Sequence, residues 1–477
     1  MMNIVVFSVG PIFPHHVHGG SQKILREITL YWGKMGHQVN ILCTFRRDNA
    51  EPFQLGQNVF VLPILHLKET YPEPYYTAPY NLSNLIVDIR RAVEAADVLY
   101  VHDGELLYHF LYNDVPTVVS FRDFVYPDTL AGAFSFRRDL LILNSQYVAN
   151  CVIDAFSTFC PSVVERLRVI PNGINLLHFR PSSTNQIRQL IVLPETAIPI
   201  LYPHRPDPRK GIYEAIEVMA KLRQRLGKIG DDLKLLIPLW IDEQVANDSK
   251  HIYQTIYSQV QNYANELNVG DLIIYHPWIS YELLPEYYSL GRATLCIGNF
   301  VEAFGNSCVE SVACGTPCVV SRVATYRDLL PDSLITKVDY GDLEATVDAV
   351  EAAINSRYNI DEAREFIDST YGYERMLVEY EKAITEVQLS SPIQETYSKL
   401  LSSSDLLKIP AWCYYGTHGY YNDYSYGYEN NLIVQKLFKQ FKFPTTVAEV
   451  IKAGFTINEI ENLLRSGLLV KSCSSYL

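Results

Sequence analysis

Hydrophobic residues in the first part of the chain form short continuous runs, separated by segments with helical periodicity. These runs lie at 3–9, 38–44, 97–102, 117–121 and 140–144. Continuous apolar runs of this length are typical of strands buried on both faces of a parallel sheet. Residues 21–37 instead carry apolar positions at helical spacing, with Ser21 as the expected N-cap and Gly36 near the end. The pattern predicts an α/β domain.

The same alternation restarts after residues 182–186, which we interpret as a linker. Strands are expected at 199–204, 233–239, 271–276 and 293–298, and helices at 211–226, 251–267 and 282–291. Two successive blocks of this kind predict two Rossmann-like, doubly wound domains that face each other across a cleft. We expect the first domain at 1–181 and the second at 182–370.

The chain changes character from about residue 390. Residues 413–428 are dense in tyrosine and glycine, and two short helical patterns follow at 445–454 and 456–467. Each of these patterns ends in glycine, which suits a helix C-cap. We interpret 390–477 as a small appended domain with a winged-helix-like fold, which could bind an acceptor or mediate oligomerisation.

Charge and composition indicate which kinds of partner and cellular location are compatible with the sequence. The formal net charge of −13 disfavours nucleic acid, whose binders need a basic surface. The first residues are expected to form a buried strand rather than a signal peptide, and no apolar run approaches the ~18 residues of a membrane span. The nine cysteines form no CxxC pair, which suits a reducing, cytoplasmic location. Contact with a membrane surface and assembly into a homo-oligomer stay open.

The stretch at 302–318, EAFGNSCVESVACGTPC, carries candidate chemistry between two expected strands. Asn306 is the expected N-cap of a helix whose first-turn amides suit a phosphate group, and Gly305 lets a ligand approach the backbone. Glu302 and Glu310 could accept hydrogen bonds from sugar hydroxyls on either side. A phosphate site between two acceptors of hydroxyl groups is the arrangement expected for binding a sugar nucleotide. The alternative is that both glutamates are surface carboxylates near a helix N-terminus, where negative charge is mildly stabilising.

This stretch, an E-x7-E spacing followed by SVACGTPCVV, resembles the donor-site signature of retaining GT-B glycosyltransferases of the family-4 type. Three further segments agree with that family: HHVHGGSQ at 15–22, VIPNGIN at 169–175 and HRPDPRKG at 204–211. The resemblance is ordered along the chain and spans residues 1 to about 388. It also implies that 371–389 form the family's last helix, which crosses back to the first domain.

The resemblance implies roles for particular residues. The catalytic set would be His102, Arg205, Lys210 and Glu302, and the donor-binding set Gly19, Gly20, Asn172, Phe304, Gly305, Asn306 and Glu310. Arg209, beside Lys210, is the alternative for either cationic role. No metal or other cofactor is expected, because fixed cations and helix amides can stabilise a diphosphate leaving group. The cluster His15, His16 and His18 fits no helix face, and we interpret these residues as part of a loop.

Three positions depart from the family pattern. Arg122 stands where many relatives have a histidine, His204 where a glycine is common, and Asn175 where an aspartate is frequent. These departures put the identity of the donor or acceptor in doubt more than the type of reaction.

The leading hypothesis is a retaining glycosyltransferase that moves a sugar from a nucleoside-diphosphate sugar to an acceptor hydroxyl without a metal. The alternative is a non-catalytic GT-B partner or chaperone that binds a glycosyltransferase or its acceptor. A phosphorylase or synthase acting on sugar phosphates is a third. The sequence does not identify the donor sugar or the nucleotide base. It does not identify the acceptor either, which could be a glycan, a lipid-linked sugar, a small molecule or a protein.

Overall fold

The chain folds into two compact units, which we describe separately. In this computed structural model, the described residues are 1–15, 17, 19–67, 78–104, 108–156, 159–239, 247–355, 359–396 and 401–472. Unit 1 comprises Met1–Asn172, Glu374–Tyr414 and Asn431–Leu477, and unit 2 comprises Gly173–Tyr373 and Tyr415–Asn430. The first segment of unit 1 therefore ends at Asn172, whereas a boundary was expected at 181, and residues 415–430 of the expected appended domain belong to unit 2.

Unit 1 is built on a sheet with the strand order β3-β4-β2-β1-β5-β6-β7-β8. Its strands are β1 (Asn3–Ser8), β2 (Gln38–Thr44), β3 (Phe53–Gly56), β4 (Val59–Leu65), β5 (Val98–His102), β6 (Thr117–Phe121), β7 (Leu140–Leu143) and β8 (Leu167–Val169). All neighbours pair in parallel except β3 and β4. The five predicted strands are confirmed, and the β3–β4 pair was not predicted.

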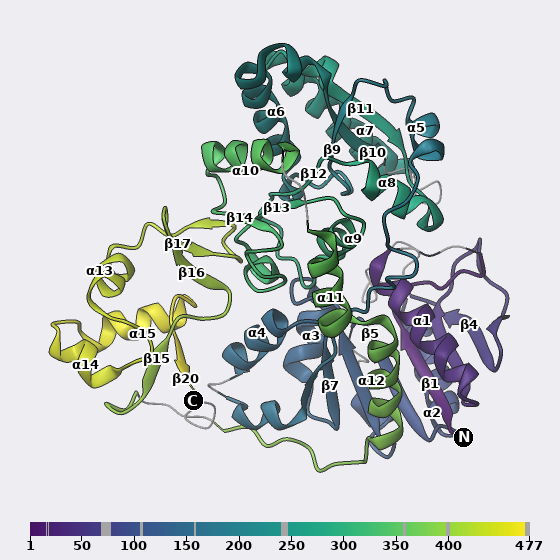
Figure 1. Ribbon diagram of the computed structural model, residues 1–477. Coiled ribbons are helices and arrows are strands. Elements are labelled where there is room, and N and C mark those ends of the chain that lie inside the picture. Colours follow the sequence, from purple (N-terminus) through teal and green to yellow (C-terminus); the bar gives the residue numbers. More distant parts are fainter. Residues whose placement is uncertain are drawn as a thin grey trace. The chain divides into compact units, whose positions relative to one another are not determined.

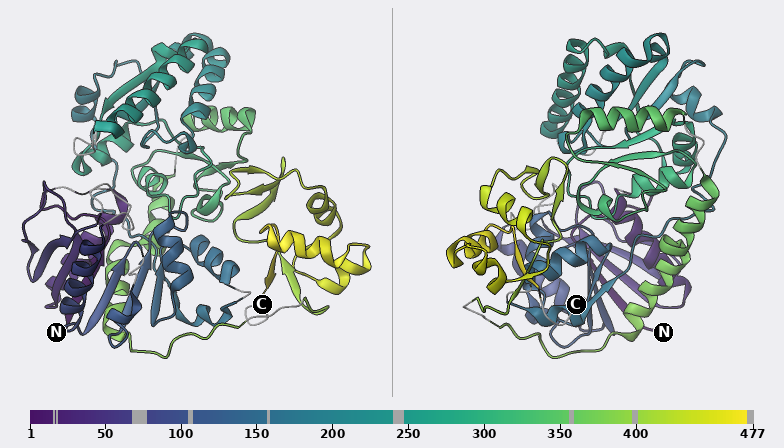
Figure 2. Two further views of the ribbon diagram at one scale, coloured as in Figure 1. Left: turned by 180° about the vertical axis from the view of Figure 1, so that it is seen from behind. Right: turned by 60° about the vertical axis from the view of Figure 1, so that its left-hand side comes forward.

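Helices cover both faces of this sheet (Figures 1 and 2). They are α1 (Gly20–Lys34), α2 (Pro79–Val93), α3 (Pro127–Ser135), α4 (Gln146–Phe156) and α12 (Tyr373–Glu386). Ser21 is not the N-cap of α1, because the helix begins at Gly20 and Gly19 takes the cap position. Tyr380 on α12 is fully buried against this unit.

Unit 2 contains a fully parallel sheet with the strand order β11-β10-β9-β12-β13-β14. Its strands are β9 (Ile198–Leu201), β10 (Leu233–Leu239), β11 (Ile273–Pro277), β12 (Ala293–Cys296), β13 (Cys318–Ser321) and β14 (Thr336–Val338). The two Rossmann-like sheets confirm the predicted α/β fold class.

Two hydrophobic cores fill the faces of the unit 2 sheet. One core is formed with α5 (Asn185–Ile191), α8 (Leu284–Leu290), α9 (Asn306–Ala313) and α11 (Ile360–Tyr371), and the other with α6 (Ile212–Leu226), α7 (Asn247–Glu266) and α10 (Leu343–Asn355). The strands read as continuous apolar runs because helices cover them on both sides.

The last part of the chain contributes to both units. In unit 1, a small antiparallel sheet has the order β19-β15-β20, with helices beside it. These elements are β15 (Leu406–Lys408), α13 (Leu432–Gln440), β19 (Thr445–Thr446), α14 (Val447–Lys452), α15 (Ile457–Arg465) and β20 (Val470–Ser472). Both α14 and α15 start with a capping box, at Thr446 with Glu449 and at Thr456 with Glu459, a signal readable from the sequence.

Between these elements, residues 413–428 form a sheet of their own, in which β17 and β18 pair in antiparallel. Its strands are β16 (Cys413–Gly416), β17 (Gly419–Asn422) and β18 (Gly427–Tyr428), in that order. Tyr420 and Tyr421 are fully buried. The tyrosine-rich segment therefore serves as packing, and its central rings are not available for stacking with a sugar in solution.

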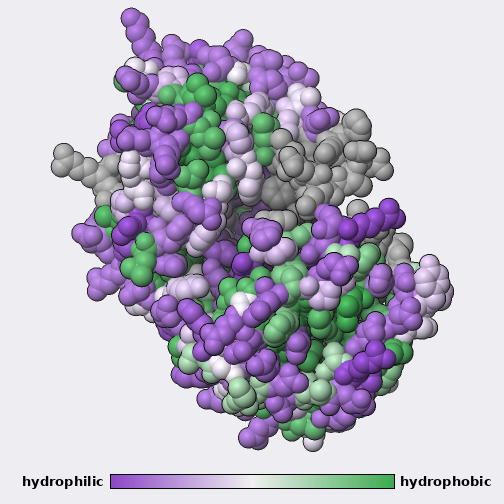
Figure 3. Space-filling view, turned by 90° about the vertical axis from the view of Figure 1, so that its right-hand side faces the viewer, coloured by the Kyte–Doolittle hydropathy of each residue, from purple (hydrophilic) through white to green (hydrophobic). Residues whose placement is uncertain are grey.

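Hydrophobic residues at the surface occur in patches among hydrophilic ones on the face that Figure 3 shows. Among the described helices, none is both long enough and apolar enough to cross a membrane.

We predict that Phe179→Ala destabilises unit 2 by about 3–5 kcal/mol. The Phe179 side chain is fully buried and packs edge-on against Tyr281, with ring centroids 5.8 Å apart. The substitution removes these contacts and leaves a cavity. The measurement is denaturant unfolding followed by hydrogen exchange of unit 2 peptides. Leu177→Ala is the control, because Leu177 is 84% exposed, and an equal loss in both variants would contradict the assignment of Phe179 to the core.

Candidate functional site

The predicted donor residues of unit 2 lie at the point where the strand order reverses. From β9 the chain proceeds outward to β10 and β11, and it then returns to β12 on the other side of β9. The loops that follow β9 and β12 leave the same edge of a parallel sheet at adjacent positions. Crevices outside the carboxyl ends of strands at such a reversal are the usual ligand sites of open α/β sheets.

The two loops approach each other closely at Gly298. A Cβ atom at this position would clash with the carbonyl oxygen of Arg209 and would lie 2.5 Å from the nitrogen of Gly211. Phe300 donates its backbone N–H to the same Arg209 oxygen at 2.9 Å. Because glycine has no side chain, the backbones can pack directly and hold Lys210 beside the second loop.

Lys210 and Glu302, both predicted catalytic residues, form an ion pair across these loops. The Lys210 ammonium also lies 3.7 Å from the centre of the Phe300 ring, a cation–π contact. Both side chains are mostly buried. Burial, the largest single influence, would raise the pKa of Glu302, but the charge and hydrogen bond of Lys210, together with smaller contributions from His204 and Arg205, hold that pKa below its ordinary value. Glu302 is therefore a carboxylate fixed beside a cation.

The helix that follows Glu302 begins one residue earlier than predicted. Gly305, with φ of 85°, is the N-cap of α9, and Asn306 is the first helical residue, so the expected cap at Asn306 is wrong. A side chain at position 305 would be strained at this φ and would meet the ring of Tyr326 at 2.7 Å. The first-turn amides of α9 lie at the carboxyl edge of the sheet, as the phosphate hypothesis requires.

Two other predicted donor residues are buried inside unit 2. Glu310 is only 7% exposed and accepts a hydrogen bond from the Tyr288 hydroxyl at 3.1 Å. Phe304 is buried and packs edge-on against Tyr371, with ring centroids 5.2 Å apart. A role for Glu310 in binding ribose stays a prediction, and its carboxylate already has one protein partner.

The two arginines near Lys210 differ in their surroundings. Arg205 is exposed at the surface of the loop. The Arg209 guanidinium is bound by the Asp207 carboxylate, with its Nη2 atom 2.8 Å from Oδ2 and its Nε atom 3.1 Å from Oδ1. His204, which replaces a common glycine, is buried, and its Nε2 lies 3.1 Å from the carbonyl oxygen of Leu295. The histidine therefore fills space beneath the loop.

The predicted residues of unit 1 also lie at a reversal of strand order, between β1 and β5. His102 is the last residue of β5 and pairs in register with Ser8 of β1. Gly19 and Gly20, which follow the loop after β1, are exposed at the start of α1. The fold thus brings the glycine loop and His102 to the same edge of this sheet.

The His102 imidazole is fully buried, and both of its ring nitrogens form hydrogen bonds. Its Nδ1 lies 3.0 Å from the Tyr100 hydroxyl, and its Nε2 lies 3.0 Å from the Ser21 hydroxyl. Ser21 donates its own proton to Asp103, at 2.7 Å, so the serine oxygen accepts from Nε2–H and Tyr100 donates to Nδ1. Burial, followed by the charge of Arg122, lowers the pKa of His102 to about 3. The imidazole is neutral near pH 7.

Arg122 and Asn172 are partners in unit 1. Arg122 is 7% exposed, donates from Nη1 to the Tyr380 hydroxyl at 2.7 Å, and donates from Nη2 to the side-chain oxygen of Asn172. The predicted donor residue Asn172 therefore holds the arginine that replaces the family histidine. Its donor-binding role stays a prediction.

Asp103, which directly follows His102, lies near a second carboxylate, Asp123, and Asp123 in turn lies near Asp128. Burial, followed by mutual repulsion with Asp123, raises the pKa of Asp103 above its ordinary value. Burial and then the Asp123 charge also raise the pKa of Asp128, to about 6. Asp123 directly follows Arg122 at the carboxyl end of β6, which is the signal that could have drawn attention to it.

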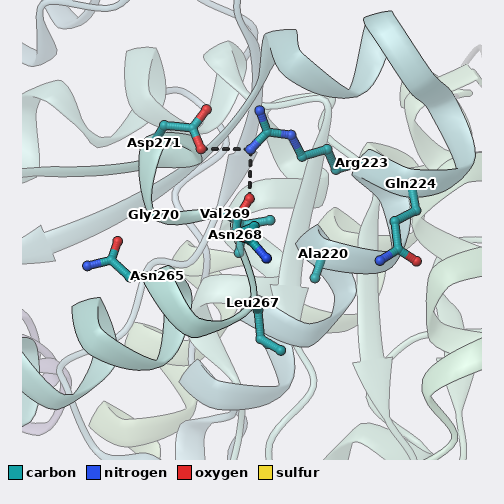
Figure 4. A pocket seen from close by; sticks show the side chains of 9 residues that line it. All are labelled: Ala220, Arg223, Gln224, Asn265, Leu267, Asn268, Val269, Gly270 and Asp271. Carbon is teal, nitrogen blue, oxygen red and sulfur yellow. Dashed lines mark hydrogen bonds and ion pairs between the residues drawn. The ribbon is translucent and has the colours of Figure 1, made fainter.

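The surface pocket drawn in Figure 4 is separate from the candidate donor site and contains none of the predicted site residues. It is lined by Ala220, Arg223, Gln224, Asn265, Leu267, Asn268, Val269, Gly270 and Asp271. Arg223 there donates to Asp271 at 2.7 Å and to the Asn268 carbonyl at 2.8 Å. Asp271 precedes β11, so the pocket adjoins the amino end of a strand, away from the edge that carries Lys210 and Glu302.

Within the described part of the chain, no group of three or more His, Cys, Asp and Glu side chains is arranged to hold a metal ion. His16 and His18 of the predicted histidine loop lie outside the described residues.

Comparison with known proteins identifies the family. Residues 18–177 match the model of Glycosyltransferase Family 4, and residues 183–372 match the model of Glycosyl transferases group 1. The chain belongs to the family-4 glycosyltransferases of the GT-B type. The first match ends at residue 177 and the second begins at 183, close to Asn172, where the first segment of unit 1 ends. Each Rossmann-like sheet of this glycosyltransferase therefore corresponds to one family model.

Curated relatives match over a limited length. The D-inositol 3-phosphate glycosyltransferases of Acidothermus cellulolyticus and Geodermatophilus obscurus are each 26% identical, over 194 and 218 residues. These matches cover 41% and 45% of this chain and 40% and 46% of the relatives. The chain therefore matches less than half the length of these relatives.

Solved structures share the fold. Sucrose-phosphate synthase from Thermosynechococcus elongatus has a TM-score of 0.63 at 18% identity, covering 81% of this chain and 99% of that one. Anabaena HepE in complex with UDP-glucose has a TM-score of 0.61 at 14% identity, covering 81% and 100%. At these identities, the likeness concerns the fold alone.

We predict that the His102 imidazole keeps its neutral form down to pH 5. Its folded pKa of about 3 lies below the ordinary value of about 6.5. His102 therefore contributes stability that is fully present above pH 6.5 and is lost as the pH falls towards 3. The measurement is a ¹⁵N NMR titration of the ring nitrogens, assigned with His102→Gln. A midpoint near 6.5 would show that the buried hydrogen-bonded arrangement is not the state in solution.

Proposed function

We propose that this chain is a retaining, metal-independent glycosyltransferase that uses a nucleoside-diphosphate sugar. In the proposed reaction, the bond between the anomeric carbon and the β-phosphate oxygen breaks. A bond between the same carbon and an acceptor hydroxyl oxygen forms on the same face. The hydroxyl proton passes to the departing phosphate oxygen, so the reaction needs no separate carboxylate base.

The observation that carries this proposal is the position of Lys210 at the carboxyl edge of the unit 2 sheet, beside the start of α9. Negative charge builds up on the diphosphate as its bond to the sugar breaks. A fixed ammonium and the first-turn amides of a helix stabilise that charge more in the transition state than in the ground state. Phe300 and Glu302 hold the ammonium in place before the donor binds.

Glu302 has a second role in the proposal. When the diphosphate binds, it competes with Glu302 for the ammonium, and the carboxylate oxygens become acceptors for hydroxyls of the transferred sugar. His102 is proposed to contact the donor sugar, Arg205 to contact the diphosphate and Glu310 to contact the ribose. Because His102 is fully buried, its proposed contact requires movement of the adjoining glycine loop.

The named relatives guide the choice of substrates to test. Anabaena HepE is a structural neighbour in complex with UDP-glucose, and the curated relatives are named D-inositol 3-phosphate glycosyltransferases. UDP-glucose is therefore the first donor to test, followed by GDP- and ADP-sugars. Inositol phosphate is the first acceptor, and the acceptor of this chain is otherwise unassigned.

We predict that Lys210→Ala and Glu302→Gln each lower the rate of nucleoside diphosphate release by about 10²–10³-fold. The first substitution removes the charge opposite the leaving group, and the second removes a charged acceptor of the sugar hydroxyls. A coupled assay that detects free nucleoside diphosphate measures the rate across the donor panel.

Lys221→Ala is the matched control for this test. Lys221 lies on α6 of the same unit, where its ammonium pairs with Glu344 at 2.8 Å on the surface. The control should retain wild-type activity, because an exposed ion pair contributes little to stability. Equal activity of Lys210→Ala and Lys221→Ala would refute the assigned site. Donor binding without turnover, even with acceptors present, would instead favour the non-catalytic partner role.

We predict that removing divalent ions leaves the activity unchanged. Dialysis against EDTA should alter the rate of diphosphate release by less than about twofold, because Lys210 and the α9 amides supply the stabilising charge. A loss of activity that Mg²⁺ or Mn²⁺ restores would require a metal-assisted mechanism in place of the one proposed.

A further inference from the structure

The hairpin formed by β17 and β18 carries a four-residue tip at Asp423–Tyr426. The tip closes through a hydrogen bond from the Tyr426 N–H to the Asp423 carbonyl at 3.3 Å. Although the tip is more than a hundred positions away in sequence from Lys210 and Glu302, it belongs to the same unit. Figures 1 and 2 show β17 beside the segment that carries β14.

One side of the tip contacts both loops that hold the Lys210–Glu302 pair. The Arg209 guanidinium lies between two rings, 5.1 Å from the centre of Phe300 and 5.8 Å from that of Tyr426. Asn299 donates its side-chain N–H to the Tyr426 carbonyl at 3.1 Å. Phe300 is the same ring that contacts the Lys210 ammonium. Tyr426 is therefore linked to Phe300, the ring that contacts Lys210, through the Arg209 guanidinium and through the neighbouring Asn299.

The other side of the tip supports the backbone of Glu302. The Asp423 carboxylate is fully buried and is bound by the Arg327 guanidinium through two hydrogen bonds of 2.9 and 2.6 Å. It also accepts the N–H of Ala324 at 3.1 Å. The turn Ala324–Arg327 in turn contacts Glu302, because the Thr325 N–H donates to the Glu302 carbonyl at 3.4 Å. Asp423 thus fixes the turn beside Glu302.

The rest of the hairpin is attached to unit 2 independently of these contacts. The Thr417 N–H donates to Asp339 at 2.8 Å, and the Tyr428 hydroxyl donates to the Tyr340 carbonyl at 3.0 Å. The hairpin is consequently held in the turn before β17 and at the end of β18, and the loss of one side chain at the tip should leave it in place.

We propose that the tip Asp423–Tyr426 is part of the donor site, with Tyr426 as a positioning residue for Lys210 and Asp423 as a positioning residue for Glu302. Neither residue is proposed to touch the donor. This inference rests on the proposed function only for the identity of the ligand. The arrangement of Lys210 around Phe300 does not depend on it.

The test compares Tyr426→Ala, Tyr426→Phe and Asp423→Asn with the wild type in the full chain. The control is Tyr415→Ala, because Tyr415 lies in the same segment and is 47% exposed. Two readouts are used: calorimetric titration with UDP, GDP and ADP, and the rate at which an acylating reagent labels Lys210, measured by mass spectrometry. The first readout reports the phosphate site, and the second reports how firmly the amine is held without any ligand.

For Tyr426→Ala we expect the dissociation constant of the nucleoside diphosphate to rise about tenfold, because Arg209 loses its contact with the tyrosine ring and Phe300 is held less firmly. Lys210 labelling should become several-fold faster. Tyr426→Phe should stay within about twofold of the wild type in both readouts, because the ring contact remains and the lost Arg209–hydroxyl contact is long, at 3.4 Å. Tyr415→Ala should match the wild type.

Asp423→Asn tests the second contact separately. The amide keeps the size of the carboxylate but removes its charge opposite Arg327, so we expect weaker diphosphate binding together with faster labelling of Lys210 through the displaced Glu302. This variant keeps the inference falsifiable where Tyr426→Ala is recovered only in unfolded form.

The outcomes separate the inference from the proposed function. Unchanged binding and unchanged labelling in folded Tyr426→Ala and Asp423→Asn would overturn the inference and leave the proposed function intact. Absence of any nucleoside diphosphate binding by the wild type would contradict the proposed function, and the labelling rates would still decide whether the tip positions Lys210. Equal effects in Tyr415→Ala and Tyr426→Ala would reduce the hairpin to a structural role and overturn the inference.

Discussion

The ion pair between Lys210 and Glu302 is the constraint on which the geometry of the donor site depends. Each residue follows a different strand: Lys210 ends the short 3-10 helix Pro208–Lys210 after β9, and Glu302 lies in the irregular loop after β12. Removing one partner would leave the other charge buried and uncompensated, which typically costs about 3–5 kcal/mol. The pair can form because Gly298 lets the two backbones meet. The loops therefore keep one arrangement only while both charges and the glycine are present.

An ion pair at this position also links two parts of a nucleotide sugar. Before a ligand binds, the carboxylate and the ammonium neutralise each other, so the mostly buried pair carries no net charge. On the proposed function, a diphosphate draws the ammonium towards itself and frees the carboxylate for a sugar hydroxyl. Phosphate binding would then prepare the contact with the sugar, because both processes act on the same pair. A free sugar could not separate the pair in this way, since a hydroxyl competes poorly with a carboxylate for an ammonium.

The sequence predicts those features that depend on local pattern. Continuous apolar runs predict the strands. Lys210 and Glu302 were assigned to one donor site by the family resemblance, and the shared carboxyl edge of a parallel sheet is the physical reason that they meet. The helix starts were misplaced where glycine takes the cap: Gly305 and Gly19 make no side-chain hydrogen bond to the first-turn amides, whereas Asn306 and Ser21 were expected to cap with their side chains. The full burial of His102 could not be predicted, because one of its two side-chain partners, Ser21, comes from α1, whereas His102 and Tyr100 both lie on β5.

The hairpin tip was beyond prediction for a further reason. Its tyrosines follow neither a helical nor a strand period, and their composition suggested an exposed binding surface. The partners of the tip are instead residues that precede it by roughly a hundred to two hundred positions: Arg327 binds Asp423, and Arg209 contacts the Tyr426 ring. Closing so long a stretch of chain costs little more entropy than closing a short one, because the cost grows only with the logarithm of its length. The buried pair of Asp423 with Arg327 then prevents the tip from leaving, since departure would strand a charge without its partner. Docking of the tip and the order of the two donor loops are thus parts of one cooperative arrangement within unit 2.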